Sequence, residues 1–432
     1  MPVSVRYNKL KTFKEDLKVS SLKLDISQKK TWQAEPKIDV IKKLDKDKSS
    51  KGHIISKIAC SLWYVTTDTY IRELVPALIA EPEIRELGVV DENMQTIGII
   101  VRMDLLNFLN NRYGKQLLVN RTINDLLGDE DLQFLIMQTP EFHFNRDIFS
   151  VIAELKNKLE TTEKIRFLLT KKDGTFAGIF TNIDVLLYLS VITRMDIDQA
   201  AELQSRVVKE KTYFNTGIFE FSATSKMAKG VGGDFYIADK HLDDRWVLSL
   251  CDVSGKGVSA GLLTTLLGAL FTIYDFKKGL GNFVKQINRY IFNTFNMEKY
   301  LTGFFATFDE KTGKLVYYDM GHAYVFIYRN KKLFMVKSSD KNIPIGFVEE
   351  VEAVANEIVL QKSDYLMIFT DGFSEQTNFE NKEYPLLNKL PELIEKNPFE
   401  KVLEMLSLDI DNFRGIQPQA DDMTAFILKY NG

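Results

Sequence analysis

The stretch Gly232-Gly233-Asp234-Phe235-Tyr236 opens a part of the chain in which apolar runs alternate with aspartates. The run Trp246–Cys251 ends at Asp252, the run Tyr365–Thr370 ends at Asp371-Gly372, and Asp421-Asp422 directly precedes Met423–Lys429. Runs of this length and composition predict strands. We therefore expect carboxylates from four separate strands to lie at strand ends, with two glycines before Asp234 that allow close backbone approach.

Such a set of carboxylates has a specific chemical meaning. Carboxylates that gather in one place repel one another unless a cation neutralises them. Oxygen ligands without partnering His or Cys suit Mg²⁺ or Mn²⁺ rather than Zn²⁺. Two such ions ~3.5–4 Å apart can bridge a water and lower its pKa, which produces a hydroxide nucleophile for phosphoryl transfer. A single aspartate at a strand end is usually a turn residue, but four in this order favour a metal centre.

The motifs GGDFY, DVSGKG, GHA, PIG, TDG and DDMT resemble the SpoIIE-like branch of the PPM (protein phosphatase type 2C-like) metal-dependent phosphatases. The resemblance covers residues 213–432 and implies an α+β fold, an α/β/β/α sandwich with two Mn²⁺ or Mg²⁺ ions. It implies that Asp234 bridges both metals, that Asp252 and the Val253 carbonyl belong to the same centre, and that Asp371 and Asp421 hold the second metal. Asp422 is expected beside the ligands rather than among them.

This family typically removes phosphate from Ser or Thr on small regulatory proteins, often anti-sigma-factor antagonists. The resemblance therefore predicts a protein serine/threonine phosphatase with a phosphorylated regulatory protein as its substrate. The chain departs from the usual motifs at Ile237, at Ala323 and at Glu383-Tyr384-Pro385. These departures put substrate geometry in question and remove no proposed ligand. The alternative is a catalytically weak, nucleotide-responsive scaffold or binding protein.

Two further residues near these motifs have two interpretations each. Gly255-Lys256-Gly257 lacks the spacing of a P-loop, so it is interpreted as the turn that opens a helix, with Lys256 as a candidate for attracting the substrate phosphate. His322 is a candidate general acid for the leaving serine oxygen. The alternative for His322 is a turn histidine with a structural hydrogen bond.

Residues 53–190 contain two similar units. Each has a helical stretch (Ile71–Ala80 and Ile148–Leu159), a strand, a polar turn, a second strand and a further helix. The turn of the second unit contains Asp173-Gly174, a strong hairpin signal. Internal similarity of this kind predicts a duplicated α/β module.

The two units resemble a tandem CBS (cystathionine β-synthase-like) pair, a family that typically binds adenine nucleotides. The second unit keeps the motif as Gly178-Ile179-Phe180-Thr181-Asn182-Ile183-Asp184, whereas Val101 replaces the hydroxyl residue in the first. A hydroxyl at a helix N-terminus donates to phosphate, and an Asp nearby accepts from ribose hydroxyls. Thr181 and Asp184 are therefore the candidate adenine-nucleotide site, as a regulator. The alternative is that they only cap a helix.

Residues 191–212 are expected to form a helical connector, with Ile197, Ala200, Leu203 and Val207 on one apolar stripe. Within it, AAELQSRVV resembles the stretch that precedes these catalytic domains and often dimerises, which implies a homodimer. The stripe alone also suits packing on its own domain.

The remaining features bound the class of protein. Residues 1–52 carry fourteen Lys and Arg against seven Asp and Glu, and are interpreted as a solvated, partly disordered basic extension rather than a nucleic-acid arm. Cys60 and Cys251, the two cysteines, build no disulfide framework. The uncharged stretch Gly257–Tyr274 is expected to be a buried helix rather than a membrane span. With no signal peptide in the N-terminal residues, the cytoplasm is the expected location.

Overall fold

The computed structural model describes residues 40–45, 52–111, 113–159, 161–242, 245–322, 324–337 and 342–432. The chain divides into two compact units, Met1–Val191 and Ile192–Gly432. Most of the basic extension predicted for residues 1–52 lies outside the described residues. None of the described helices has the length and apolar character needed to cross a membrane.

The first unit consists of two halves that share the order strand, helix, strand, strand, helix, and the first half has additional short elements. The first half contains β1 (Lys42–Lys43), η3 (Ile55–Ile58), β2 (Trp63–Thr66), α2 (Ile71–Ala80), β3 (Glu86–Val90), β4 (Thr96–Val101), α3 (Arg102–Asn110), α4 (Gly114–Leu118), α5 (Ile123–Leu127), η4 (Gln133–Leu135) and β5 (Ile136–Met137). The second contains β6 (Glu141–His143), α6 (Ile148–Leu159), β7 (Arg166–Thr170), β8 (Phe176–Thr181) and the start of α7 (Asn182–Ser205).

Strand pairing shows that the two halves are copies of one fold. In the first half β2 runs parallel to β3, which pairs antiparallel with β4. In the second half β6, β7 and β8 repeat this arrangement. Both hairpins have a register shift at the same point, after Val89 in one and after Leu169 in the other. The duplicated α/β module predicted from the sequence is therefore present, while the assignment to the CBS family stays a prediction.

The predicted connector differs from the structure at both ends. Residues 182–205 form one continuous helix, α7, because no Gly or Pro interrupts them. The helix ends at Ser205, and β9 (Lys211–Asn215) begins within the range that was expected to be helical. Its residues Thr212, Tyr213 and Phe214 are β-branched or aromatic and pair with β10.

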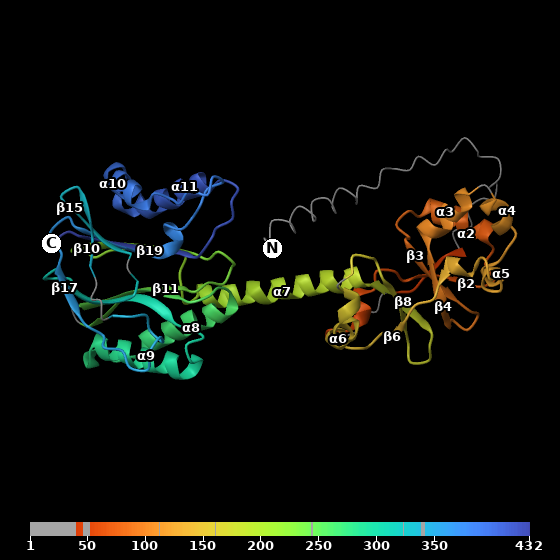
Figure 1. Cartoon of the computed structure of the whole chain (residues 1–432), viewed down its shortest axis with the longest axis horizontal. Coiled ribbons are helices and arrows are strands. Elements are labelled where there is room, and N and C mark those ends of the chain that lie inside the picture. Colours follow the sequence, from red (N-terminus) through yellow and green to blue (C-terminus); the bar gives the residue numbers. More distant parts are fainter. Residues whose placement is uncertain are drawn as a thin grey trace. The chain divides into compact units, whose positions relative to one another are not determined.

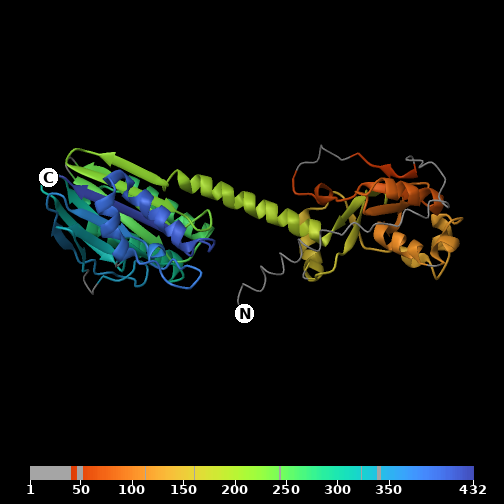
Figure 2. The ribbon, with the colours of Figure 1, turned by 90° about the horizontal axis from the view of Figure 1, so that it is seen from above.

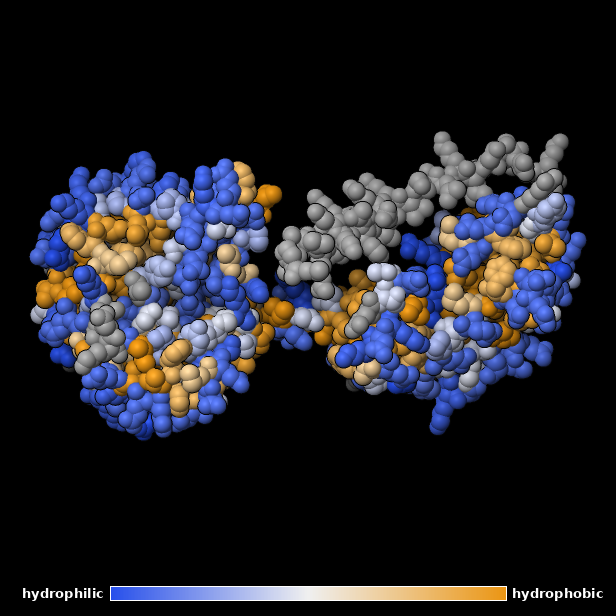
Figure 3. Space-filling view, in the orientation of Figure 1, coloured by the Kyte–Doolittle hydropathy of each residue, from blue (hydrophilic) through white to orange (hydrophobic). Residues whose placement is uncertain are grey.

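The predicted apolar stripe is also divided. Ile197 lies against Gly230, since a Cβ built on that glycine would be 3.6 Å from Ile197 Cγ2. Val207 follows the end of the helix and packs on Gly268 of α8. Leu203, by contrast, is 62% exposed. Part of the stripe therefore packs on the second unit itself. Further exposed apolar residues of α7 lie nearer its start, at Leu186, Leu187, Val191 and Met195, and apolar residues are visible along this helix in Figure 3.

The second unit is a sandwich of two sheets with helices on both outer faces (Figures 1 and 2). One sheet has six strands in the order β16-β15-β18-β19-β10-β9, and the other has five in the order β11-β12-β13-β14-β17. The strands are β10 (Phe219–Lys226), β11 (Asp234–Leu242), β12 (Arg245–Val253), β13 (Leu301–Asp309), β14 (Lys314–Met320), β15 (Val325–Arg329), β16 (Lys332–Met335), β17 (Asn356–Val359), β18 (Tyr365–Phe369) and β19 (Met423–Tyr430).

The helices form the outer layers of this sandwich. Figure 1 shows α8 and α9 over the five-stranded sheet and α10 and α11 over the six-stranded one. They are α8 (Val258–Ile273), α9 (Leu280–Phe295), α10 (Leu386–Lys396) and α11 (Val402–Arg414), with the short turns η5 (Phe276–Lys278), η6 (Asp371–Phe373) and η7 (Phe399–Lys401). The α/β/β/α sandwich predicted for residues 213–432 is therefore confirmed.

Two apolar cores hold the layers together. The larger lies between the sheets and under α8 and α9, and includes Phe221, Leu250, Phe304 and Phe426. The smaller joins the six-stranded sheet to α10 and α11. Helix α8 buries Ala260, Leu263, Leu267 and Phe271, which are three or four residues apart and form one face. The uncharged stretch 257–274 is thus a helix of the sandwich that buries one face, as expected in part, while its other face is exposed at Leu262 and Ile273.

Candidate active site

The predicted aspartates meet at one edge of the sandwich. Asp234 is the first residue of β11 and pairs directly with Asp252 of β12 in the five-stranded sheet. Asp371 follows β18 and Asp421 precedes β19, and these two strands are neighbours in the other sheet. A pocket of about 360 Å³ is lined by Asp252, Asp371 and Asp421, and also by Val253. The fold thus brings together carboxylates that are up to 187 residues apart in the chain.

Burial and mutual repulsion raise the pKa values of these carboxyls. Asp234 is 1% exposed, and its pKa lies well above the ordinary value because of burial and of the charges on Asp252 and Asp422. Burial, with the charges of Asp371 and Asp421, raises the pKa of Asp252 to about 7. The pKa of Asp371 is raised by burial and by Asp421. Such a cluster favours positive charge, which a divalent cation would supply.

Glycines and Asp422 fix the loop that leads into Asp234. A Cβ on Gly233 would lie 2.6 Å from the Val253 carbonyl oxygen, so only glycine fits this close approach. The Asp422 carboxylate accepts hydrogen bonds from the backbone N–H of Ala228 and of Gly233, each at 2.7 Å. Thr370 Oγ1 donates to Asp234 Oδ2 at 2.9 Å. These contacts are consistent with Asp422 as a residue that holds the ligands in place, which stays a prediction.

Lys256 is the basic side chain among the residues that line this pocket. Its Nζ lies 2.8 Å from Asp421 Oδ2 and donates to the Ala420 carbonyl oxygen at 2.8 Å. The side chain is 35% exposed, so its ammonium is accessible to an incoming anion. The turn Gly255-Lys256-Gly257 does open a helix, α8, as the sequence predicts.

His322 lines the same pocket and is 4% exposed. Its backbone N–H donates to Asp319 Oδ1 at 2.7 Å. Neither ring nitrogen has a hydrogen-bond partner among the residues that the structure describes. Burial lowers the pKa of the ring to about 4, so the imidazole is neutral at pH 7. The expected structural hydrogen bond is therefore made by the backbone and not by the ring.

The donor set fits Mg²⁺ or Mn²⁺, because it contains carboxylate and carbonyl oxygens from Asp234, Asp252, Val253, Asp371 and Asp421. Some of these oxygens have other partners, Lys256 for Asp421 and Thr370 for Asp234. Within the described ranges, no group of three or more His, Cys, Asp or Glu side chains is arranged to hold a metal ion. The fit rests on the chemistry of these oxygen ligands and on their position at one edge of the sandwich. The individual ligand assignments stay predictions.

Gln204, near the end of α7, is a site residue that the sequence did not single out. Its side chain is 4% exposed. Its Nε2 donates to the Gly232 carbonyl at 2.7 Å and to Thr264 Oγ1 of α8 at 2.7 Å, while its Oε1 accepts from the Gly232 N–H at 3.1 Å. Gln204 thus ties α7 to the loop that carries Asp234. The signal in the sequence is a polar residue directly after Leu203 of the apolar stripe.

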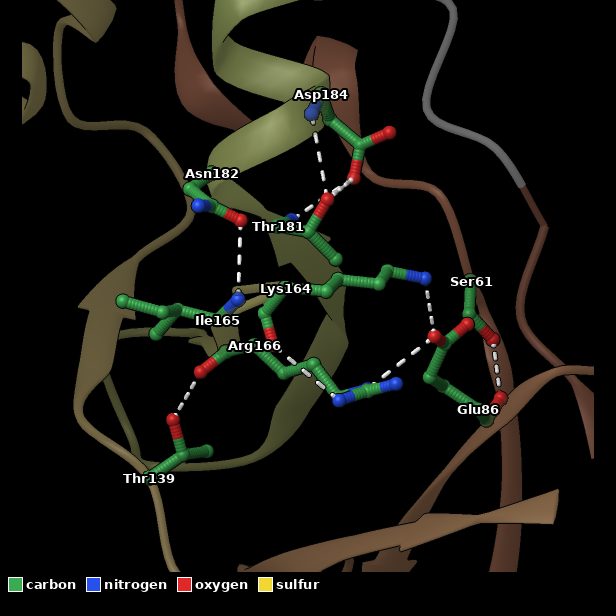
Figure 4. A network of polar contacts seen from close by, with 9 residues as sticks. All are labelled: Ser61, Glu86, Thr139, Lys164, Ile165, Arg166, Thr181, Asn182 and Asp184. Carbon is green, nitrogen blue, oxygen red and sulfur yellow. Dashed lines mark hydrogen bonds and ion pairs between the residues drawn. The ribbon is translucent and has the colours of Figure 1, made fainter. Parts of the chain in front are cut away.

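The candidate nucleotide residues in the first unit bond to each other. Thr181 N and Oγ1 donate to Asp184 Oδ2 at 2.8 and 2.6 Å, and Asp184 N donates to Thr181 Oγ1 at 3.3 Å. These bonds cap the start of α7, which agrees with the capping alternative. Close by, the buried Glu86 carboxylate pairs with Lys164 and Arg166 (Figure 4).

Comparison with known proteins places the second unit among phosphatases. Residues 242–431 match the family described as Stage II sporulation protein E (SpoIIE). The chain is 24% identical to phosphoserine phosphatase RsbU of Bacillus subtilis over 242 residues, which cover 55% of this chain and 70% of RsbU. The second unit resembles these serine phosphatases.

One further curated relative and one solved structure are similar to parts of the chain. Phosphoserine phosphatase RsbP of Bacillus subtilis is 22% identical over 199 residues, which cover 43% of this chain and 46% of RsbP. The solved SiaA-PP2C domain of Pseudomonas aeruginosa is 16% identical with a TM-score of 0.46, and the match covers 56% of this chain and 98% of that domain.

Proposed function

We propose that this chain hydrolyses phosphoserine or phosphothreonine on a regulatory protein. The enzyme class, a metal-dependent serine/threonine phosphatase, is supported by the SpoIIE match and by the phosphoserine phosphatases RsbU and RsbP. The observation that carries the proposal is the convergence of carboxylates from both sheets on one pocket. A regulatory protein of the anti-sigma-factor antagonist type is the proposed substrate, because phosphatases of this kind typically act on such proteins.

In this proposal Asp234, Asp252, Asp371, Asp421 and the Val253 carbonyl hold two Mn²⁺ or Mg²⁺ ions. Bound there, the ions supply a hydroxide at neutral pH and neutralise charge on the phosphoryl group. Thr370 orients the carboxylate of Asp234 through its hydroxyl. Asp422 holds the Ala228 and Gly233 amides, which sets the position of the Asp234 loop.

Two other residues of the pocket act on the substrate in this proposal. The Lys256 ammonium, which now contacts Asp421 at 2.8 Å, attracts and orients the substrate phosphate. The neutral His322 ring has an N–H that no described residue accepts. Because both ring nitrogens are buried in this conformation, donation to a phosphoryl oxygen or to the serine oxygen that leaves requires the ring to turn toward the pocket.

The first unit is proposed to regulate this activity. The candidate ligand is an adenine nucleotide at Thr181 and Asp184, and the candidate route is α7, which begins at that site and ends at Gln204 beside Gly232. The protein is proposed to act as a homodimer through the exposed apolar residues of α7. A nucleotide changes turnover only if it binds two states of this connection unequally.

The direct test is hydrolysis of p-nitrophenyl phosphate by the purified full chain with Mn²⁺ and with chelator. We expect turnover that needs Mn²⁺ and that stops on chelation. Turnover that is the same with chelator contradicts the metal centre. A complete absence of turnover on p-nitrophenyl phosphate and on phosphoserine peptides supports the alternative, a nucleotide-responsive scaffold built on a degenerate phosphatase domain.

A further inference from the structure

A second pocket adjoins the carboxylate pocket and is unused by the chemistry above. It has a volume of about 330 Å³. Its walls come from Tyr324 and Phe326 beside β15, from Met335 at the end of β16, and from Leu386 and Leu387 at the start of α10. Most of these side chains are apolar, so the pocket suits an apolar ligand group.

The two pockets share a wall. Tyr324 lines both of them, and its carbonyl oxygen accepts from the Phe369 N–H at 3.1 Å, next to the strand end that presents Asp371. Ser374 also lines the second pocket, and its Oγ donates to the Asp371 carbonyl oxygen at 3.0 Å. The two pockets are therefore neighbours on either side of Tyr324, so a substrate segment that reaches the carboxylate pocket passes beside the apolar one.

The apolar pocket combines a rigid floor with an open rim. Tyr384 is 3% exposed and its hydroxyl donates to Asp409 Oδ2 at 2.6 Å. Phe326 and Leu386 are also buried. At the rim, Met335 is 59% exposed and Leu387 47% exposed. An incoming side chain would bury apolar surface at this rim, which favours its binding.

The pocket wall also includes an acidic side chain, Glu383. A substrate segment with acidic residues beside its apolar residue would be repelled here, whereas a basic residue would be attracted.

We propose that this pocket receives an apolar side chain of the substrate protein that lies near the phosphorylated residue in sequence, and so sets which phosphoserine segments the enzyme accepts. The proposal rests on the proposed phosphatase function. An extended segment advances roughly 3.3 Å per residue, so about four residues on either side of the phosphoserine cover about 13 Å around the carboxylate pocket, and the recognised apolar residue is proposed to lie in this window. Acidic neighbours of this apolar residue are disfavoured by Glu383, which lines the pocket.

The test uses the full chain with Mn²⁺, p-nitrophenyl phosphate, and phosphoserine peptides that carry either Leu or Asp at each position from about four before to about four after the phosphoserine. At one position the Leu peptide should have a kcat/KM about tenfold or more above that of the Asp peptide. Leu387→Asp should remove this preference by raising KM for the Leu peptide. It should leave turnover of p-nitrophenyl phosphate within about twofold, because that compound has no neighbouring residue.

The matched control is Leu408→Asp on α11, since Leu408 is 49% exposed and lines a different pocket. It should keep the Leu preference. A Leu387→Asp enzyme that still prefers the Leu peptide overturns the proposal, as does an equal loss in Leu408→Asp. If the wild-type enzyme hydrolyses p-nitrophenyl phosphate but shows no preference between the Leu and Asp peptides at any position, the pocket proposal is refuted and the phosphatase function is not. No wild-type turnover of any of these substrates refutes the phosphatase function, and the pocket proposal with it.

Discussion

Gln204 offers the sharpest test of how the helix α7 bears on the active site. The change is Gln204→Leu, which removes its three hydrogen bonds and shortens the side chain by one atom. The N–H and the carbonyl of Gly232 then lose their partner inside the buried loop before Asp234. Thr264 keeps a partner, because its hydroxyl also contacts the Gly261 carbonyl oxygen.

The structure gives the size of the effect. Each buried backbone group left without a partner costs about 1–3 kcal/mol, so two such groups predict a loss of about 2–6 kcal/mol in the free energy of unfolding of the second unit. For a domain of this size 1 kcal/mol lowers Tm by about 2–4 °C. Because Gly232 is two residues before Asp234, the freed loop should also lower kcat on p-nitrophenyl phosphate.

The assays are urea unfolding and Mn²⁺-dependent turnover of the purified variants. Gln199→Ala is the matched control, since Gln199 is exposed on the same helix and should change neither quantity. Thr264→Val removes one of the three bonds and should have an intermediate effect. A Gln204→Leu protein with wild-type unfolding and wild-type turnover would refute the argument that this contact holds the Asp234 loop.

Four further predictions concern the metal centre, the phosphate, the assembly and the regulator. Asp371→Asn should remove most Mn²⁺-dependent turnover with an unchanged circular dichroism spectrum, because the residue lies in a turn after β18; near-normal turnover of the folded variant would contradict the ligand assignment. Lys256→Met should raise KM for a phosphopeptide about tenfold, through loss of one charged contact worth about 1.5 kcal/mol, and an unchanged KM would exclude Lys256 from phosphate binding. Val191→Glu, at a residue 56% exposed on α7, should convert a dimer into a monomer in light scattering, since a charge buried between two chains is unfavourable; a wild-type monomer would remove the dimer. Asp184→Ala should abolish calorimetric binding of AMP, ADP or ATP and any response of turnover, with basal turnover intact; absence of wild-type binding below millimolar concentration would end the sensor interpretation.

The sequence predicted the strand ends of the sandwich well because each aspartate adjoins a long apolar run. The runs before Asp252 and Asp371 correspond to β12 and β18, and the run after Asp422 corresponds to β19. The helical stretches predicted at Ile71–Ala80 and Ile148–Leu159 of the duplicated module likewise correspond to α2 and α6. In these elements the local pattern and the tertiary packing favour the same structure.

Contacts between distant segments were not predictable from local pattern. The bonds of Gln204 to Gly232 depend on where the end of α7 meets the sandwich, and the pair Lys256–Asp421 joins residues 165 positions apart. The prediction that Ile197, Ala200, Leu203 and Val207 form one helical stripe was wrong for the same reason. Its spacing is helical, but Val207 lies beyond the helix end and packs under α8, so one periodic pattern contributes to two environments.

The pairing of Glu86 with Arg166 has a consequence for recognition between copies of the first unit. These residues are the first positions of β3 and β7, equivalent places in the two halves, and they carry opposite charges. Two identical halves from different chains would bring Glu86 to Glu86, or Arg166 to Arg166, with no counterion in a buried site. The charges therefore favour pairing of a first half with a second half over pairing of two identical halves. A fragment that contains one half alone would lack an oppositely charged partner even at high concentration.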